Sequence, residues 1–217
     1  MITENTIEIK KTARYYTIGD PENNIKTLWL VLHGYGQLAK EFISEFELIT
    51  NDTTMIIAPE GLSKFYFRGF SGNIGASWMT KEDRENDIID YVKFINETLE
   101  NISSQIQNKE YKINLLGFSQ GCHTAIRWLD RTKKEVDSLT LFGGSFPEDV
   151  NFEENSKYWS SIKTTLFLGN KDRMVNREKV ESQIKELNKI DFRPNLISHD
   201  GGHQIKAELL INLSKNI

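Results

Sequence analysis

Short runs of apolar residues alternate along the chain with segments in which apolar residues recur every three or four positions. A short apolar run predicts a buried strand, and the longer spacing predicts a helix with one apolar face. The acidic start EDREND, before residue 88, is typical of a helix N-terminus. The expected strands are 6–11 (TIEIKK), 13–18 (ARYYTI), 28–33, 54–59, 112–118, 137–144, 163–170 and 192–200, and the expected helices are 38–49, 88–106, 120–131, 176–190 and 204–215.

After the two opening strands, strand and helix alternate to the end of the chain. This order predicts an α/β fold, with a mostly parallel sheet covered by helices on both faces. No composition shift marks a boundary, so we expect one domain over residues 1–217. In such sheets the chemistry lies in loops at the carboxyl ends of the strands. Residues 60–80 are expected to form a loop rich in glycine and aromatic residues.

Composition narrows the class of protein. The 217 residues are 38% hydrophobic and 27% charged, with a formal net charge of −4, which fits a packed core and disfavours a nucleic-acid partner. No apolar run is long enough for a membrane span, and the N-terminus lacks an apolar secretory region, so we expect a cytoplasmic protein without stable membrane insertion. The lone Cys122 permits no internal disulfide and no Cys/His metal spacing, so no metal is expected. We read it as a small buried hydrophobe.

The pentapeptide GFSQG, residues 117–121, matches Gly-x-Ser-x-Gly. It follows an expected strand and opens an expected helix, which is the strand–turn–helix context that a nucleophilic serine at a sharp turn requires. Glycines on both sides of Ser119 relieve the crowding of such a turn, and the helix N-terminus favours developing negative charge. The alternative is a serine N-cap between two packing glycines.

A serine nucleophile needs a histidine base, and in this architecture the base comes last in the chain order Ser, acid, His. Of the four histidines, His33 precedes the serine and His123 lies on the same helix, where we expect it to face away from the strand-end loops. His199 and His203 remain. We favour His203, because it lies in a flexible DGGH turn, whereas His199 is closer to the body of a strand.

The acid that orients the base has two candidates. Asp172 follows the strand 163–170 directly and precedes an amphipathic helix, whereas Asp149 follows the preceding strand. We favour Asp172 because of this placement, although either residue can be an ordinary turn aspartate. The HGYG segment 33–36 ends another strand, so the N–H of Tyr35 and the N–H of Gln120 can together form an oxyanion hole.

Taken together, these motifs resemble the α/β-hydrolase family, in particular the phospholipase/carboxylesterase branch that includes acyl-protein thioesterases. The resemblance rests on LHGYG, GFSQG, GNKD with a valine three residues later, and GGH before the last helix, and it spans nearly the whole chain. It implies an eight-stranded sheet with one antiparallel strand, a triad of Ser119, Asp172 and His203, and oxyanion N–H groups from Tyr35 and Gln120. The branch has Leu and then Gly-Asp after His-Gly, whereas this chain has Tyr-Gly-Gln.

The segment 60–80 carries an unusual number of large apolar side chains. They can form a wall for the acyl or alcohol part of a substrate, or they can pack on the sheet as an extra core layer. The gap between residues 144 and 162 is too short for a cap domain, so the site should be open. The candidate wall residues are Phe65, Phe67, Phe70, Trp78 and Met79.

These patterns predict a serine hydrolase that cleaves carboxylic esters or thioesters of small molecules through an acyl-enzyme, without a cofactor. The alternatives are a lysophospholipase or depalmitoylase acting on long chains, a serine peptidase of the same fold, and a binding module without catalysis. The intact set of serine, acid and histidine disfavours the last. The expected assembly is a monomer or a homodimer.

Overall fold

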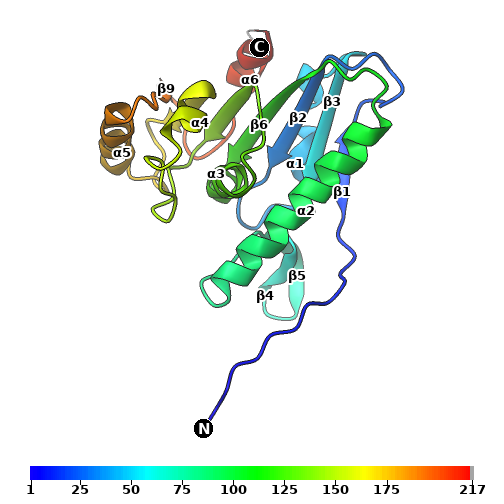
Figure 1. Ribbon diagram of the computed structural model, residues 1–217, viewed down its shortest axis with the longest axis vertical. Coiled ribbons are helices and arrows are strands. Elements are labelled where there is room, and N and C mark those ends of the chain that lie inside the picture. Colours follow the sequence, from blue (N-terminus) through cyan, green and yellow to red (C-terminus); the bar gives the residue numbers. More distant parts are fainter. Residues whose placement is uncertain (216–217) are drawn as a thin grey trace.

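The computed structural model describes residues 1–215, which form a seven-stranded sheet flanked by helices (Figure 1). The strand order is β1-β3-β2-β6-β7-β8-β9, in which only β1 is antiparallel to its neighbour. These strands are β1 (Tyr15–Ile18), β2 (Thr27–Leu32), β3 (Thr54–Pro59), β6 (Lys112–Phe118), β7 (Ser138–Phe142), β8 (Lys163–Gly169) and β9 (Asn195–His199).

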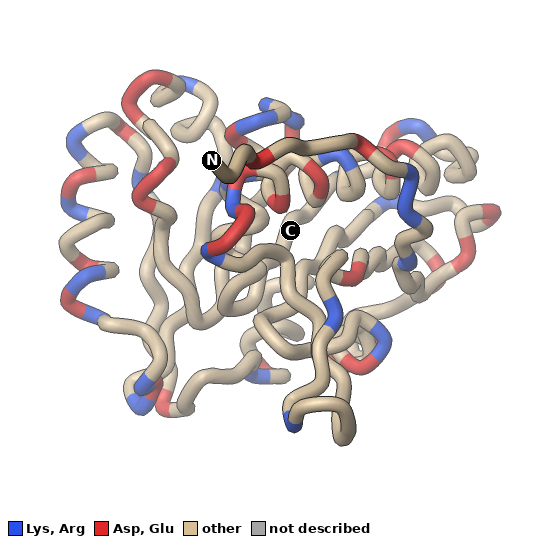
Figure 2. The backbone as a smooth tube through the Cα atoms, turned by 90° about the horizontal axis from the view of Figure 1, so that it is seen from below, with Lys and Arg blue, Asp and Glu red and all other residues tan. Residues whose placement is uncertain are grey.

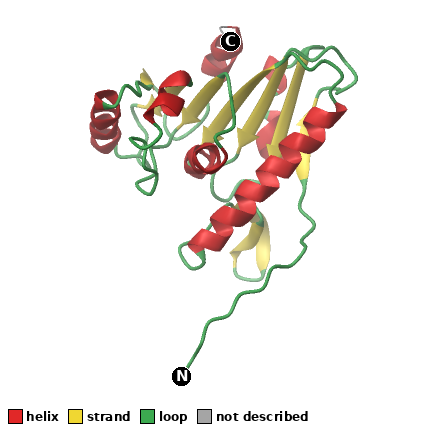
Figure 3. Cartoon of the chain, viewed as in Figure 1, coloured by secondary structure: helices red, strands yellow, loops and turns green. Residues whose placement is uncertain are grey.

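Helices cover both faces of the sheet, so the central strands are buried on both sides (Figure 3). Along β2, residues 28, 30 and 32 face one core and residues 29 and 31 the other, which explains why the strand is a continuous apolar run. One core is closed by α2 (Arg84–Gln105), α3 (Gln120–Thr132), α4 (Ser156–Ser161) and α5 (Arg177–Lys189), and the other by α1 (Ala39–Ser44), the 3₁₀ helix η1 (Glu47–Ile49) and α6 (Ala207–Lys215).

The expectation of a mostly parallel α/β fold is confirmed, but the expected eight strands are wrong, because the sheet has seven. The segment 6–11 forms no strand. Its apolar and polar residues alternate as in a strand, yet residues 1–12 are exposed and no neighbouring strand pairs with them. The chain leaves the body of the protein there (Figure 1).

The segment expected as a loop over residues 60–80 contains a β-hairpin instead, formed by β4 (Ser63–Arg68) and β5 (Ser71–Ser77). It stands apart from the main sheet, at the end of α2 that begins with Arg84 (Figure 3). Between β7 and β8 the chain adds only the six-residue α4. The hairpin is therefore the element that projects at the carboxyl ends of the strands.

In the view of Figure 2, charged residues of both signs are interspersed along the backbone. None of the helices within residues 1–215 has the length and apolar character needed to span a membrane. Over the same residues, no group of three His, Cys, Asp or Glu side chains is arranged to hold a metal ion.

Candidate active site

Ser119 occupies a sharp turn between β6 and α3, as the sequence predicts. Its backbone has φ 54° and ψ −114°, a conformation that is strained for a residue other than glycine. The turn is fixed by a hydrogen bond from the N–H of Ser119 to the carbonyl oxygen of Phe142 in β7, at 2.9 Å. The serine is thereby presented at the N-terminus of α3, at the edge where the parallel strands end.

Both glycines of the GFSQG motif are required by close backbone contacts. A Cβ atom on Gly117 would lie 2.4 Å from the carbonyl oxygen of Gly121, and one on Gly121 would lie 2.1 Å from that of Leu32. Such distances are far inside van der Waals contact. The motif is therefore a steric requirement of packing α3 directly against β2 and β6.

The structure brings Ser119, His203 and Asp172 into one hydrogen-bonded chain. The Nε2 atom of His203 lies 2.9 Å from the Oγ atom of Ser119, and the Nδ1 atom lies 2.8 Å from Oδ2 of Asp172. Because an ionised carboxylate only accepts hydrogen bonds, Nδ1 carries the proton and Nε2 is free to accept one from the serine hydroxyl. This is the arrangement that activates a serine nucleophile.

The carboxylate of Asp172 is itself fixed. Its side chain is only 1% exposed, and its Oδ1 atom accepts hydrogen bonds from the N–H groups of Met174 at 2.8 Å and Val175 at 3.2 Å. The imidazole of His203 also packs against Phe118, with ring centroids 5.0 Å apart. The acid and the base are held in one orientation before any substrate arrives.

His199 and Asp149, the alternatives for the base and the acid, make other contacts. His199 is buried, and its Nδ1 atom accepts a hydrogen bond from the N–H of Gly201 at 3.1 Å. Asp149 pairs with Arg127 and Arg84. Burial alone would raise the pKa of Asp149, but the hydrogen bonds and charge of these arginines outweigh burial and lower it to about 2. Neither residue has a hydrogen bond to Ser119 or His203 among those found in residues 1–215.

The expectation that His123 faces away from the strand-end loops is wrong. Its Nε2 atom lies 3.0 Å from Oγ of Ser145, in the loop after β7. Residues four apart on a helix share a face, so His123 lies one turn along α3 on the same side as Ser119. Burial and the neighbouring charge of Arg127 lower the pKa of His123 to about 4, which keeps the ring neutral.

The HGYG loop lies directly beside the serine. A Cβ atom on Gly34 would be 3.1 Å from Cβ of Ser119, and the N–H of Gly36 donates to the carbonyl of Ala76 at 2.8 Å. By contrast, the N–H groups of Tyr35 and Gln120 have no protein acceptor among residues 1–215. Two free donors beside a nucleophile suit a developing oxyanion.

Sequence reasoning missed two side chains that hold the segments beside Ser119. The buried His33 accepts a hydrogen bond from the N–H of Gly61 at its Nε2 atom (2.9 Å), and its Nδ1–H donates to the carbonyl of Gly34 (2.8 Å). Burial lowers the pKa of His33 to about 4, so the ring stays neutral and can make both bonds. The side chain of Gln120 donates to the carbonyl of Met79 at 3.0 Å and accepts from the N–H of Trp78 at 3.2 Å. The sequence feature that could have pointed to these two side chains is their position inside the HGYG motif (His33) and the GFSQG motif (Gln120).

The expected aromatic wall divides into two groups. Trp78 does not face a substrate, because it is 1% exposed in the core and donates from its indole N–H to the carbonyl of His33 at 2.8 Å. Phe65 stacks on Tyr35, with ring centroids 5.0 Å apart, and Phe67 packs edge-on against Phe65 at 5.3 Å.

The other two members of the expected wall also differ from each other. Phe70, at the hairpin turn, is fully exposed and has no ring contact among residues 1–215. Met79 is half-buried, and its sulfur lies 3.5 Å from Nη1 of Arg127. Phe65, Phe67 and Met79 therefore stay candidates for the wall, whereas Phe70 does not.

A family model described as "Serine hydrolase (FSH1)" matches residues 24–208, a range that includes Ser119, Asp172 and His203. The chain belongs to this family. No curated protein matches the chain significantly. The protein is thus a member of a serine hydrolase family, and its hydrogen-bonded serine lies within the matched range.

Solved structures place the fold. The chain is 18% identical to acyl-protein thioesterase 2 from Zea mays, over 94% of this chain and 97% of that one, with a TM-score of 0.70. It is 16% identical to a carboxylesterase from Mesorhizobium loti, over 94% of this chain and 95% of that one, with a TM-score of 0.69. It is 14% identical to a carboxylesterase from Bacillus cereus, over 94% of this chain and 92% of that one, with a TM-score of 0.66. At these identities the similarity establishes the fold alone, which is that of the α/β hydrolases.

Proposed function

We propose that the protein hydrolyses carboxylic esters or thioesters through a covalent acyl-enzyme formed on Ser119. The observation that carries the proposal is the hydrogen-bonded chain from Asp172 through His203 to Ser119, at 2.8 and 2.9 Å. Membership of a serine hydrolase family supports it. The fold shared with an acyl-protein thioesterase and with carboxylesterases favours ester and thioester carbonyls as the substrate class.

In the first half-reaction, the Oγ atom of Ser119 attacks the carbonyl carbon while Nε2 of His203 takes the hydroxyl proton. The carbonyl electron pair moves to oxygen, and the resulting oxyanion accepts hydrogen bonds from the N–H groups of Tyr35 and Gln120. Asp172 holds the imidazole in the correct tautomer and stabilises the imidazolium. The oxyanion then collapses, the bond to the leaving alcohol or thiol breaks, and His203 returns the proton to that group.

In the second half-reaction, a water molecule repeats the sequence on the acyl-enzyme. His203 takes a proton from the water as its oxygen attacks, and the collapse of the second tetrahedral intermediate releases the acid and restores Ser119. The aromatic and thioether side chains of Phe65, Phe67 and Met79 form the apolar wall for the substrate.

The test combines turnover with covalent labelling. We expect nitrophenyl esters to be hydrolysed and a fluorophosphonate probe to label Ser119 in the wild type. Ser119→Ala should remove labelling and lower turnover on the order of 10³-fold or more, with the fold retained. His203→Ala should cost a similar factor, whereas His199→Ala, the matched histidine control, should not.

Four outcomes would contradict the proposal. Near-wild-type turnover by Ser119→Ala would rule out Ser119 as the nucleophile. Loss of turnover in His199→Ala but not in His203→Ala would rule out His203 as the base. A wild type that is neither labelled nor active on esters would favour the binding module, and cleavage of aminoacyl amides in preference to esters would favour a peptidase. A cytoplasmic location and a monomeric or dimeric state stay predictions.

A further inference from the structure

Two arginines share one carboxylate near the candidate active site. Asp149, in the loop after β7, accepts from Nε of Arg127 at 2.9 Å and from Nη2 of Arg127 at 2.9 Å. The Nη2 atom of Arg84, the first residue of α2, lies 2.6 Å from the same carboxylate. Arg84, Arg127 and Asp149, here called the arginine cluster, thus have one positive charge in excess.

The charges around the cluster do not cancel this excess. Glu85 is exposed and paired with Arg131 at 3.1 Å, although it also lies 3.9 Å from Arg84. Lys179 and Glu148 pair with each other at 2.6 Å. Each of these pairs is neutral as a unit, so the surplus guanidinium charge remains with the arginine cluster.

The cluster also has hydrogen-bond donors that face a poor acceptor. The Nη1 atom of Arg127 lies 3.5 Å from the sulfur of Met79, and Nη1 of Arg84 lies 3.8 Å from the same atom. A thioether sulfur accepts hydrogen bonds only weakly, whereas guanidinium N–H groups bind carboxylates strongly and often in pairs. Arg84 is 33% exposed, so a ligand can reach it.

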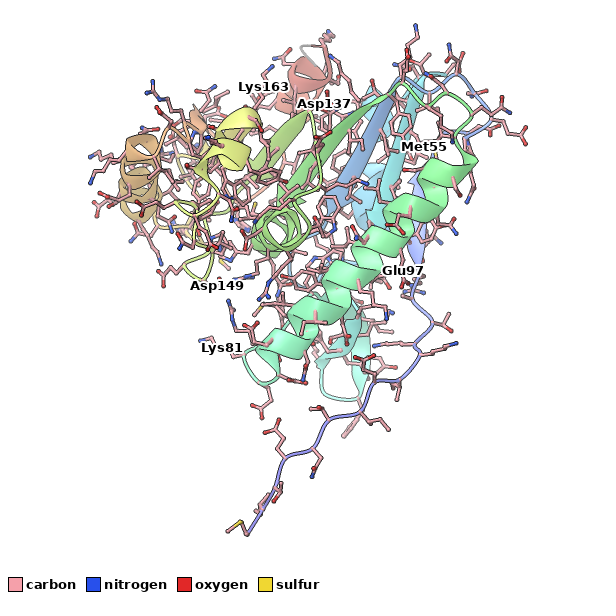
Figure 4. All side chains as sticks on the ribbon, viewed as in Figure 1. Met55, Lys81, Glu97, Asp137, Asp149 and Lys163 are labelled. Carbon is pink, nitrogen blue, oxygen red and sulfur yellow. The ribbon has the colours of Figure 1, made fainter. Side chains whose placement is uncertain are left out.

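Met79 connects the cluster to the nucleophile. Its carbonyl oxygen accepts from the side chain of Gln120, the residue next to Ser119, at 3.0 Å. Arg127 follows Ser119 by eight residues, which is about 12 Å along a helix axis, and helical side chains lean back toward the N-terminus. Asp149 lies at the edge of the sheet toward which the parallel strands run (Figure 4).

The opposite side of this region is built from the loop after β7. A Cβ atom on Gly143 would lie 3.1 Å from Nδ1 of His203, so this loop begins beneath the candidate base. Two residues later, Ser145 pairs with the ring of His123, one turn along α3 from Ser119. Ser145 and His123 are polar but uncharged, because burial keeps the pKa of His123 low.

We propose that the arginine cluster binds a carboxylate carried by the substrate, so that the enzyme prefers esters with a carboxylate about four to six carbons from the scissile carbonyl. This inference rests on the proposed ester hydrolysis and names its substrate class. The carboxylate binds the partly exposed guanidinium of Arg84, while Asp149 and the buried Arg127 keep that guanidinium in place. The same contact between guanidinium and carboxylate forms whether the carboxylate lies on the acyl part or on the alcohol part of the ester.

The experiment compares matched esters that differ only in charge. For the acyl part, the mono-nitrophenyl ester of adipic acid is compared with nitrophenyl hexanoate. For the alcohol part, the butanoate ester of 6-hydroxyhexanoate is compared with hexyl butanoate. We expect kcat/KM to be about tenfold higher for the charged member of one pair, as hydrogen bonds to a charged group predict. The pair that shows the preference identifies which part of the ester carries the carboxylate.

Substitution of Arg84 tests whether the cluster is responsible. Arg84→Gln should lower the charged-to-neutral ratio of kcat/KM about tenfold, and Arg84→Lys should recover part of it. Lys93→Gln removes the same charge nine residues further along α2 and should leave the ratio unchanged. The ratio should also fall as NaCl concentration rises, because Arg84 is partly exposed.

Two results would overturn this inference and leave the proposed function standing. One is hydrolysis of the neutral esters with no charged-to-neutral preference in either pair. The other is a preference that Arg84→Gln and Lys93→Gln lower equally, which would reflect the general field of the protein. A wild type that hydrolyses neither member of any pair would instead contradict ester hydrolysis itself.

Discussion

A Cβ atom at position 121 would lie 2.1 Å from the carbonyl oxygen of Leu32 in the neighbouring strand β2. The second glycine of the GFSQG motif therefore sets how closely α3 approaches the sheet. That distance also fixes where Ser119 lies relative to the HGYG loop, which continues from β2.

Gly121→Ala should therefore destabilise the protein. The methyl group forces α3 away from β2, and overpacking of this kind costs about 1–3 kcal/mol or more of the free energy of unfolding. Urea unfolding followed by circular dichroism measures the change. Ala125→Gly, on the same helix, provides a comparison in which helix propensity and packing change without a clash. A Gly121→Ala protein as stable as the wild type would show that the helix can move without cost.

The acid of the triad can be tested separately. Asp172→Asn should lower kcat for nitrophenyl esters on the order of 10³–10⁴-fold, because an amide does not hold His203 in the tautomer that accepts the serine proton. Asp200→Asn, an exposed carboxylate in the loop that leads to His203, is the matched control. A larger loss of turnover in Asp149→Asn than in Asp172→Asn would contradict the assignment.

The buried His33 should make stability depend on pH. Burial lowers its pKa to about 4 in the folded protein, from an ordinary value of 6.5. As pH falls below 6.5, the unfolded chain takes up a proton that the folded protein excludes, so the free energy of unfolding falls by up to ~1.4 kcal/mol per pH unit. Above 6.5 this contribution should be constant.

Urea unfolding between pH 5 and pH 8 measures this slope. His33→Asn should be less stable at neutral pH, because it loses a buried ring, and its stability should fall less steeply below pH 6.5 than that of the wild type. His123→Asn should behave similarly, since the pKa of His123 is also lowered to about 4. Equal slopes in the wild type and in both variants would mean that neither imidazole stays neutral on acidification.

The aromatic wall predicts a limited preference for chain length. Each methylene buried against Phe65 and Phe67 should raise kcat/KM about fourfold. The gain should stop after a few carbons, because the wall is open. Phe67→Ala should flatten this rise while affecting acetate esters little, because Phe67 packs over Gly36 beside the serine.

A series of nitrophenyl esters from two to sixteen carbons measures the preference. Phe70→Ala is the matched control, since Phe70 is fully exposed at the hairpin turn. If kcat/KM climbs steadily to the longest chain, a long channel or a moving element exists, and the lysophospholipase or depalmitoylase alternative gains support.

The sequence by itself determined the features that depend on neighbouring residues. The strand–turn–helix around Ser119 is local, because both glycines and the serine lie within five residues. The helices α2, α3 and α5 follow from apolar spacing, which reports one buried face. The alternation of these elements then limits the fold to a mostly parallel sheet, and parallel strands place their carboxyl ends at one edge.

Only the tertiary structure decided which distant residues meet. Apolar alternation in TIEIKK predicted a strand, but a strand needs a partner, and none lies beside residues 6–11. The large residues of 60–80 gave no sign that Trp78 is buried while Phe70 is exposed. The spacing between residues along the chain does not report such differences, because burial depends on what packs against each side chain.

The same holds for the site. Chain order left His199 and His203 both possible for the base, and the meeting of His203 with Ser119 joins residues 84 positions apart. Arg84, a helix-start residue in the sequence, meets Asp149 only because the start of α2 and the loop after β7 lie at the same edge of the sheet. Periodicity reports how a segment is buried. Which segments face each other depends on the packing of the whole chain, and that packing brings together the residues proposed for catalysis and specificity.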